Sequence, residues 1–207
     1  MLGKPPYWDD ACAQLGGRDP VLARLIASYP GISLQGRGDV FLTLARSIVG
    51  QQISVKAADS VWNRLQSALP DVSSAAVLAS DTAALRACGL SQRKVEYLAD
   101  LARHHAEGRL ASERLALMDD EAVIAELVAI RGIGRWTAEM FLMFHLMRPD
   151  VLPLDDIGLI KAVALHYHDG ERRPRQQLRL LAEAWQPYRS VATWYLWRSL
   201  EPVPVSY

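Results

Sequence analysis

Residues 131–135 read Arg-Gly-Ile-Gly-Arg and lie between two segments whose apolar residues recur at helical spacing. Gly132 and Gly134 can adopt φ > 0 and let another molecule approach the backbone closely. The N–H groups at the start of the second helix form an anion site that the helix dipole reinforces. With Arg131 and Arg135 beside the glycines, the natural ligand is a phosphate group. The alternative is an ordinary glycine turn in a hairpin of two helices.

The second chemical feature is the acidic pair Asp155 and Asp156, at the predicted start of a helix that runs to His168. The helix dipole and the free N–H groups favour an ionised carboxylate at this position. Such a carboxylate can stabilise a positive charge that develops in a reaction, or it can orient and deprotonate a water molecule. The alternative is a simple N-cap. Two adjacent aspartates allow one to cap the helix while the other takes part in chemistry.

The elements that must position these residues are nearly all helical. Proline and glycine fall between the periodic segments, and no run alternates polar and apolar residues for long, so the sequence predicts an all-α fold. Asp19, Asp39, Ser54 and Ser91 are predicted N-caps. Besides the two hairpin segments and short helices within 70–90, we expect helices over 9–15, 20–28, 39–49, 54–69, 91–107, 155–168, 174–185 and 187–200.

Length and composition narrow the class of protein. The 207 residues fit one large domain or two small lobes that share a core, and half of them are apolar. Cys12 and Cys88 are too few for a disulfide framework or a four-cysteine iron–sulfur cluster, and we expect reduced thiols in the cytoplasm. The first residues lack a hydrophobic run, so no signal peptide is expected, and the apolar stretch 136–147 is too short to span a bilayer. The net charge of zero argues mildly against nucleic-acid binding.

Several motifs together resemble one family. Gly132-Ile133-Gly134 is followed by Thr137-Ala138 and then by Asp156, and further matching blocks lie at 47–54 and 185–190. This pattern resembles the helix-hairpin-helix DNA glycosylase superfamily, in particular its 3-methyladenine DNA glycosylase II type. The resemblance implies a two-lobed helical bundle, in a compact form that lacks the N-terminal β domain of longer members. Lobe 1 would comprise residues 1–37 and 157–207, and lobe 2 would comprise residues 38–156.

The resemblance also implies roles at a base-binding pocket. Asp156 matches the catalytic aspartate, and Asp155 would be its structural partner. Trp136 stands where bifunctional members carry the lysine that forms a Schiff base, so this chain would be monofunctional, and its indole would stack on a cationic base. Trp197 and Gln51 would also contact the pocket. Met140 occupies a pocket position where related enzymes can carry an aromatic residue, which leaves the substrate range open. The alternative for either tryptophan is packing in the core.

DNA contacts follow from the same resemblance. Gln52 would enter the minor groove and fill the gap left by the extruded base, and Thr137 would join the hairpin contacts to phosphate. Arg93 and Lys94 lie at the helix end that disfavours cations, which indicates either a phosphate contact or a surface accident of small cost. The hairpin would bind a monovalent cation, Na+ or K+, which the resemblance places on the backbone carbonyls of Val128, Ile130 and Ile133. No other cofactor is expected.

The sequence therefore predicts a monomeric, monofunctional glycosylase that flips alkylated bases such as 3-methyladenine out of double-stranded DNA and excises them. We expect it in the cytoplasm, associated with the nucleoid and not with a membrane. A non-catalytic helix-hairpin-helix module that binds DNA or damaged bases is the main alternative, although such a module has no need of an acidic residue at 156. A glycosylase for oxidised or mismatched bases is disfavoured because the lysine and the cluster cysteines are absent.

Overall fold

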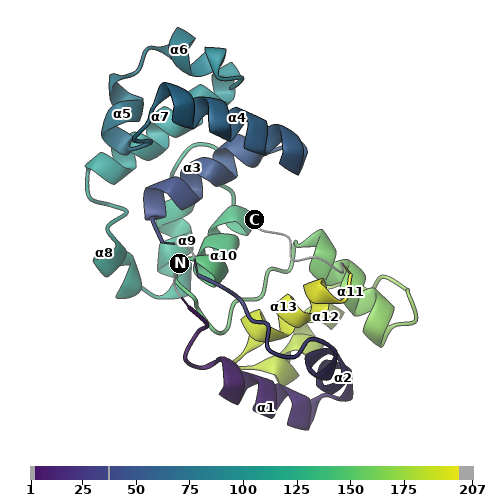
Figure 1. Cartoon of the computed structure of the whole chain (residues 1–207). Helices are drawn as coiled ribbons and strands as arrows, with labels where there is room; N and C mark the ends of the chain where they lie inside the picture. Colours follow the sequence, from purple (N-terminus) through teal and green to yellow (C-terminus); the bar gives the residue numbers. More distant parts are fainter. Residues whose placement is uncertain (1–2, 37, 201–207) are drawn as a thin grey trace. The chain divides into compact units, whose positions relative to one another are not determined.

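The computed structural model describes residues 3–36 and 38–200, and within them the secondary structure is helical, with no strand (Figure 1). The predicted all-α fold is confirmed. The chain divides into two compact units: unit 1 comprises residues 1–36 and 142–207, and unit 2 comprises residues 37–141. Among the described residues, no helix is both long and apolar enough to cross a lipid bilayer.

Unit 1 contains α1 (Trp8–Arg18), α2 (Pro20–Ser28), α11 (Ile157–Tyr167), α12 (Arg175–Leu181), the short 3-10 helix η1 (Ala182–Trp185) and α13 (Arg189–Arg198). Unit 2 contains α3 (Val40–Gly50), α4 (Val55–Ala68), α5 (Ser74–Ala79), α6 (Thr82–Ala87), α7 (Gln92–Ala106), α8 (Ser112–Ala116) and α9 (Asp120–Val128). Helix α10 (Arg135–Phe144) begins in unit 2 and ends in unit 1.

The boundaries between the units differ in part from the expected lobes. The first lies at 36/37, within one residue of expectation, but the second lies at 141/142 and not at 156/157. The physical reason is the packing of residues 144–154. Phe144, Met147, Leu152 and Leu154 all contact the hydrophobic core of unit 1, so this segment belongs to the unit that it helps to bury.

The predicted N-caps explain where several helices begin. Asp19, Asp39, Ser54 and Ser91 each have an extended backbone and accept a hydrogen bond from an N–H group in the first turn of the helix that follows. This contact satisfies a donor that has no partner within the helix. All four predicted caps are therefore confirmed.

Two local predictions were incomplete. Helix α1 was expected to end at Leu15 because Gly16 and Gly17 follow, yet it continues to Arg18. A Cβ atom on Gly16 would lie 3.8 Å from the Cα atom of Ala23 on α2, which is an ordinary contact distance, so this part of α1 packs against α2 and tertiary packing offsets the low helix propensity of glycine. The short helix α8 was not predicted, because five residues are too few to show a helical period.

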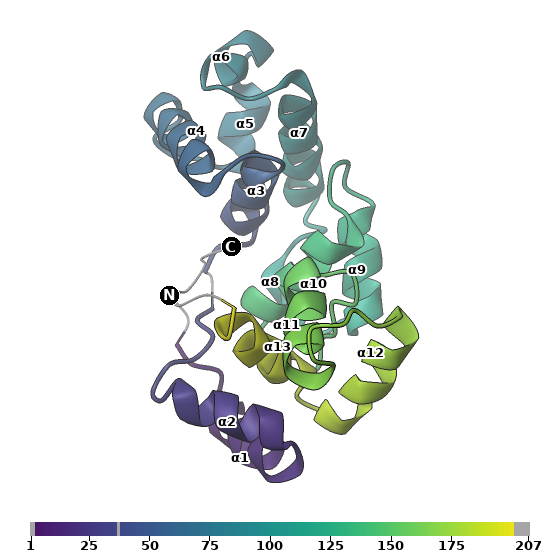
Figure 2. The ribbon, with the colours of Figure 1, turned by 90° about the vertical axis from the view of Figure 1, so that its right-hand side faces the viewer.

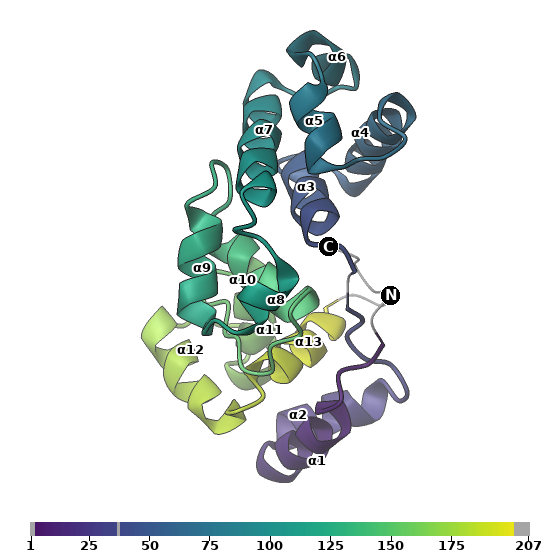
Figure 3. The ribbon, with the colours of Figure 1, turned by 90° about the vertical axis from the view of Figure 1, so that its left-hand side faces the viewer.

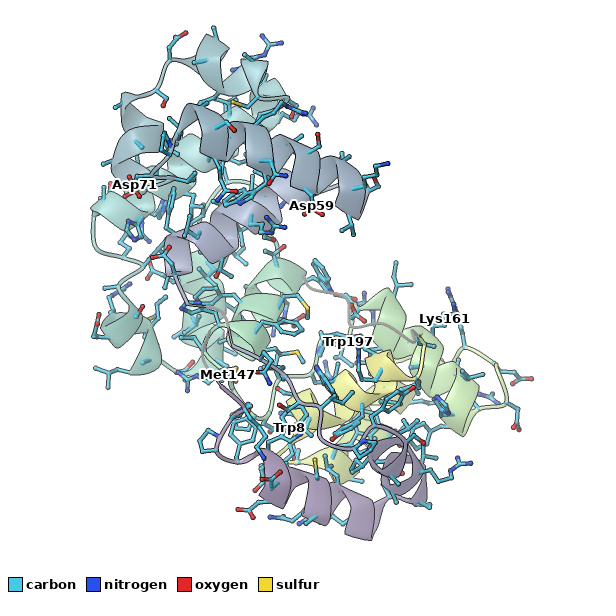
Figure 4. The ribbon with its side chains drawn as sticks, viewed as in Figure 1. Trp8, Asp59, Asp71, Met147, Lys161 and Trp197 are labelled. Atoms are coloured by element: carbon cyan, nitrogen blue, oxygen red, sulfur yellow. The ribbon has the colours of Figure 1, made fainter. Side chains whose placement is uncertain are left out.

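The core of unit 1 is rich in tryptophan, and one buried carboxylate lies within it. Figure 4 labels Trp8, which packs edge-on against Trp194 with ring centroids 5.1 Å apart. The carboxylate of Asp19 accepts hydrogen bonds from Val21 N (2.8 Å) and Leu22 N (3.1 Å) at the start of α2. It also accepts from the Tyr167 hydroxyl (2.7 Å) and from Trp185 Nε1 (3.1 Å). Asp19 therefore links α2 to α11 and η1.

Unit 2 is built around α7, which packs against α3 and α5 (Figures 2 and 3). Its buried face includes Val95, Leu98 and Leu101, and α3 buries Phe41, Leu44 and Ile48. One charged side chain, Asp100, lies on the buried face of α7 and is 8% exposed. A charge on an apolar helix face departs from simple amphipathic patterning, and here the carboxylate accepts a hydrogen bond from Arg131 N.

We predict that Asp19→Ala lowers the free energy of unfolding by about 2–4 kcal/mol, because it removes a helix cap and leaves two buried donors without an acceptor. Urea unfolding followed by circular dichroism measures the change. Glu183→Ala is the control, because this carboxylate is exposed on η1 in the same unit and should change stability by no more than about 0.5 kcal/mol. Equal effects of the two substitutions would contradict the role given to Asp19.

Candidate active site and nucleic-acid interface

The candidate residues fall in both units, and each unit is described by itself. Unit 1 holds Asp155, Asp156 and Trp197. Unit 2 holds the hairpin, the turn after α3 and the start of α7, with all the other predicted site residues.

Asp156 is the N-cap of α11, with an extended backbone (φ −73°, ψ 118°) directly before Ile157. Its Oδ1 atom accepts hydrogen bonds from Leu159 N at 2.6 Å and from Trp197 Nε1 at 2.7 Å. The side chain is 7% exposed. Two N–H donors thus converge on one oxygen atom of a buried carboxylate that lies at the positive end of the helix dipole.

One aspartate of the pair was expected to cap the helix and the other, Asp156, to take part in chemistry, but the cap is Asp156 itself. Asp155 does not cap the helix: it is exposed and forms an ion pair with Arg175 at the start of α12. Only the residue immediately before the first helical residue has the extended backbone that a cap requires, and that residue is Asp156. The cap contact uses Oδ1, the same atom that accepts the hydrogen bond from Trp197 Nε1.

Trp197 is 8% exposed and comes from α13; Figure 4 labels it. Its indole stacks on Phe144, with centroids 6.0 Å apart and an interplanar angle of 10°. Because the indole N–H donates to Asp156, Trp197 does more than fill the core. It fixes the orientation of the candidate catalytic carboxylate.

Gly158 belongs to the same cluster, and sequence reasoning missed it. A Cβ atom at this position would lie 3.0 Å from Trp197 Cδ1 and 3.1 Å from Asp156 Oδ1. The absence of a side chain therefore lets the first turn of α11 approach the hydrogen-bonded pair. The signal in the sequence was a glycine inside a predicted helix, which normally has a packing or functional reason.

In unit 2, the hairpin places its two glycines in different conformations. Gly132 has φ +86°, and a Cβ atom there would lie 2.1 Å from Cδ2 of Tyr97. Gly134 does not have positive φ, and a Cβ atom there would meet no heavy atom within 4 Å. Its carbonyl accepts from Ala138 N at 3.1 Å and so begins α10. Gly132 shapes the turn, and Gly134 leaves the start of α10 open to another molecule.

Both hairpin arginines form ion pairs within unit 2. Arg135 contacts Glu121 through both terminal nitrogens, and its Nε atom donates to Glu139 at 3.0 Å. The hydrogen bond to Glu121 is the largest cause that raises the pKa of Arg135 above its usual value. Arg131 pairs with Glu96 at 3.3 Å. The pairs of Arg131 with Glu96 and of Arg135 with Glu121 are largely exposed and each is worth little, so a phosphate can compete there for the guanidinium groups, whereas Glu139 is buried.

The three predicted site residues in the first turns of α10 differ in exposure. Trp136 is 37% exposed, which leaves part of its indole accessible. Thr137 and Met140 are buried, at 8% and 7% exposure. The side chain of Thr137 therefore packs inside the protein, and only its backbone is placed to join a hairpin contact.

The turn after α3 carries the predicted plug. Gln52 is exposed and has φ +59°, a conformation that costs energy for a residue other than glycine and that often marks a functional site. Gln51 differs from its neighbour: its Nε2 atom donates to the carbonyl of Gly132 at 2.8 Å. Gln52 is therefore exposed to solvent, whereas Gln51 is hydrogen-bonded to the hairpin.

Arg93 and Lys94 also differ in exposure and in their contacts. Arg93 is exposed at the start of α7. The ammonium group of Lys94 donates to the carbonyl of Val49 at 2.7 Å, and burial lowers the pKa of this lysine. Of the two, Arg93 has the exposure that a phosphate contact requires.

The carbonyls predicted to hold a monovalent cation lie at the end of α9 and in the hairpin. Ile130 accepts one hydrogen bond, from Ile133 N at 3.1 Å. The carbonyls of Val128 and Ile133 accept none of the backbone hydrogen bonds found among residues 3–36 and 38–200. Oxygen ligands with unused lone pairs suit a hard cation, so these residues fit the ion that was expected.

We predict that Gly132→Ala destabilises the protein by about 2 kcal/mol or more, since the added methyl group meets the Tyr97 ring and the residue has positive φ. Gly134→Ala is the matched control, with open space at its Cβ position and an expected change within about 1 kcal/mol. Thermal unfolding of both variants measures the difference. A similar loss in the two would show that the close contact with Tyr97 does not restrict residue 132.

Comparison with known proteins identifies the family. Residues 45–187 match the model of the HhH-GPD superfamily base excision DNA repair proteins. A putative DNA-3-methyladenine glycosylase of Bacillus subtilis (strain 168), YfjP, is 32% identical over 188 residues; the match covers 87% of this chain and 66% of YfjP.

Two solved structures have the same fold. The crystal structure of a DNA-3-methyladenine glycosidase from Bacillus halodurans is 34% identical, with a TM-score of 0.85, over 96% of this chain and 91% of the other. The 3-methyladenine DNA glycosylase Mag1 of Schizosaccharomyces pombe, in complex with abasic DNA, is 30% identical, with a TM-score of 0.78, over 92% and 96%. This chain therefore belongs to the HhH-GPD superfamily of base excision DNA repair proteins.

Proposed function

We propose that this chain is a monofunctional DNA glycosylase that excises alkylated, cationic bases such as 3-methyladenine from double-stranded DNA and acts as a monomer. The observation that carries the proposal is the Asp156 carboxylate, fixed at the start of α11 by Trp197 Nε1. Similar proteins bear the name of DNA-3-methyladenine glycosylase, and one of them was solved with abasic DNA, the product of such a reaction.

The reaction breaks the bond between the sugar C1′ atom and the base nitrogen. The base leaves with the bonding electron pair, and positive charge develops on the sugar. The ionised carboxylate of Asp156 stabilises this charge electrostatically. A water oxygen then bonds to C1′ and loses a proton to the carboxylate or to solvent, which leaves an abasic site.

The surroundings of Asp156 suit this task. The hydrogen bonds from Leu159 N and Trp197 Nε1 hold Oδ1 in place before the substrate arrives, so little reorganisation is needed in the transition state. Burial at 7% exposure reduces screening by water. Capping α11 needs only the hydrogen bond from Leu159 N, so the second donor, Trp197 Nε1, and the burial of the carboxylate are what favour the enzyme over a DNA-binding module without catalysis.

Trp136 supports a cationic substrate. Its side chain is partly exposed, and the π face of an indole attracts a positively charged alkylated purine more strongly than a neutral base. A cationic base is also a good leaving group without protonation, so one carboxylate suffices. An indole has no amine with which to form a Schiff base, and this supports hydrolysis without strand cleavage.

DNA binding is assigned to unit 2. The start of α10 at Gly134 offers backbone N–H groups to a phosphate, Arg131 and Arg135 add positive charge, and exposed Gln52 is placed at a turn where it can replace a flipped base. A monovalent cation held by the carbonyls of residues 128, 130 and 133 would add positive charge at the same hairpin.

We predict that Asp156→Asn lowers the single-turnover rate of base release by a factor on the order of 10²–10³, because the negative charge is lost. Asparagine is a good N-cap, so the fold should persist. The measurement is release of 3-methyladenine from methylated duplex DNA by the wild type and the variant. No strand nicking and no borohydride-trapped adduct should accompany release.

Three results would count against the proposal. Equal release by wild type and Asp156→Asn would remove Asp156 from the reaction. Strand cleavage or a trapped adduct would contradict monofunctional hydrolysis. Binding of damaged DNA without release of any alkylated base would support the non-catalytic module instead.

We further predict that Trp197→Phe slows base release about tenfold while leaving DNA affinity unchanged, because the ring still stacks on Phe144 but no longer donates to Asp156. Trp194→Phe is the matched control. It makes the same change on the same helix, in a residue that packs edge-on against Trp8. A rate loss of the same size in both variants would attribute the effect to packing and not to the hydrogen bond.

A further inference from the structure

Two turns that are far apart in the sequence lie against the same helix of unit 2. The first is the turn after α3, residues 51–54, here called the plug turn; the second is the hairpin, residues 131–134. Helix α7 contacts the hairpin through Tyr97 and Asp100, and through Lys94 it contacts Val49 near the end of α3, from which the plug turn continues. These residues are three apart and therefore lie along one side of the helix.

Lys94 binds the end of α3, directly before the plug turn. Its ammonium group donates to the Val49 carbonyl at 2.7 Å, one residue before the end of α3. The last carbonyls of a helix have no partner within the helix, and a cation there also interacts favourably with the helix dipole. Lys94 thus performs for α3 the role of a C-terminal cap, immediately before Gln51 and Gln52.

Asp100 holds the hairpin. Its Oδ2 atom accepts a hydrogen bond from Arg131 N at 2.8 Å, and its Oδ1 atom accepts one from Arg103 at the same distance. Although burial opposes ionisation, these hydrogen bonds together lower the pKa of Asp100 below its usual value. A buried acceptor for a backbone N–H of the hairpin explains why a carboxylate occurs on the buried face of α7.

Tyr97, the third of these α7 residues, packs directly against the hairpin at Gly132. Tyr97 lies so close to Gly132 that no Cβ atom fits between them. In addition, Gln51 of the plug turn donates directly to the carbonyl of Gly132 at 2.8 Å. The plug turn and the hairpin are therefore joined to each other as well as to α7.

We infer that Lys94, Asp100 and Gln51 are positioning residues that join the plug turn and the hairpin into one rigid element, so that the anchoring of a phosphate at the hairpin fixes where Gln52 enters the duplex. The inference rests on the proposed function, because it concerns the base-flipping step. The inference also gives Lys94 and Arg93 different roles, because Lys94 is hydrogen-bonded to the protein backbone and Arg93 is exposed to solvent.

The physical reason is the cost of extruding a nucleotide, which is a few kcal/mol for a paired base. A plug offsets this cost only if it occupies the vacated space at a fixed distance from the phosphates that anchor the protein. A loosely attached turn would lose part of that gain to conformational entropy. Rigid attachment is therefore needed for duplex DNA but not for a base that is already unpaired.

The test compares single-turnover excision from two substrates, a methylated duplex and the same methylated strand without its complement. For Lys94→Met we expect the ratio of the duplex rate to the single-strand rate to fall about tenfold, since one hydrogen bond of a charged donor is lost. Lys94→Arg, which keeps a cationic donor, should restore part of the ratio. Arg93→Met removes the neighbouring exposed charge; it should reduce the slope of log affinity against log salt by about one without lowering the ratio.

Several outcomes would overturn the inference. An equal loss on both substrates would mean that Lys94 supports the fold or the chemistry in general. The same fall in the ratio for Arg93→Met would mean that charge, and not the contact with Val49, is what matters. No change in the ratio for Lys94→Met would show that this contact does not position the plug.

A second measurement does not depend on catalysis, so failure of the proposed function and failure of this inference can be told apart. Amide hydrogen exchange is followed at residues 50–54 and 131–134 in the wild type, Lys94→Met and Asp100→Ala. Because Gln51 joins the turns, each variant should speed exchange in both segments, with thermal unfolding confirming that the protein stays folded. If each variant loosens only the turn that it contacts, the two turns are not one rigid element. If the wild type releases no base but the coupling is present, the proposed function fails and the coupling stands.

Discussion

The carboxylate of Asp156 is held by two N–H groups that converge on one oxygen atom, and the organisation of unit 1 follows from this contact. The first donor, Leu159 N, belongs to the turn that Asp156 caps, and the second, Trp197 Nε1, reaches it from α13. A charge with 7% exposure is costly unless it accepts strong hydrogen bonds. The stacking of Phe144 on Trp197 and the missing side chain at Gly158 allow α11 and α13 to approach as the contact requires.

Unit 2 uses a different principle. There the groups expected to meet DNA are largely backbone groups and one exposed glutamine, and side chains act mainly on the protein itself. Lys94 binds a backbone carbonyl of α3 just before the plug turn, and Asp100 and Gln51 bind backbone atoms of the hairpin. Even the hairpin arginines pair with Glu96, Glu121 and Glu139. Because these glutamates balance the arginine charges within the protein, the hairpin is in keeping with a chain that carries no net charge.

Much of this could be read from the sequence because it depends on local rules. Ser and Asp before periodic apolar residues marked the starts of helices, and the N-caps Asp19, Asp39, Ser54 and Ser91 are confirmed. The glycines and arginines of the hairpin identified the turn between α9 and α10. The motifs of the hairpin, of Asp156 and of residues 47–54 and 185–190 together indicated the family before any tertiary contact was known.

Other features depend on contacts between distant segments, which no local pattern reveals. The order of Asp155 and Asp156 at the cap, the bond from Trp197 forty-one residues later and the links from α7 to both turns are of this kind. The same holds for the unit boundary at 141/142. By itself the sequence determined most of the helices, through their periodicity and caps, and the family, through motifs that resemble it; that resemblance also gave Asp156 as the candidate catalytic residue. Only the tertiary structure decided which donors hold each charged group, because that choice depends on which surfaces pack together.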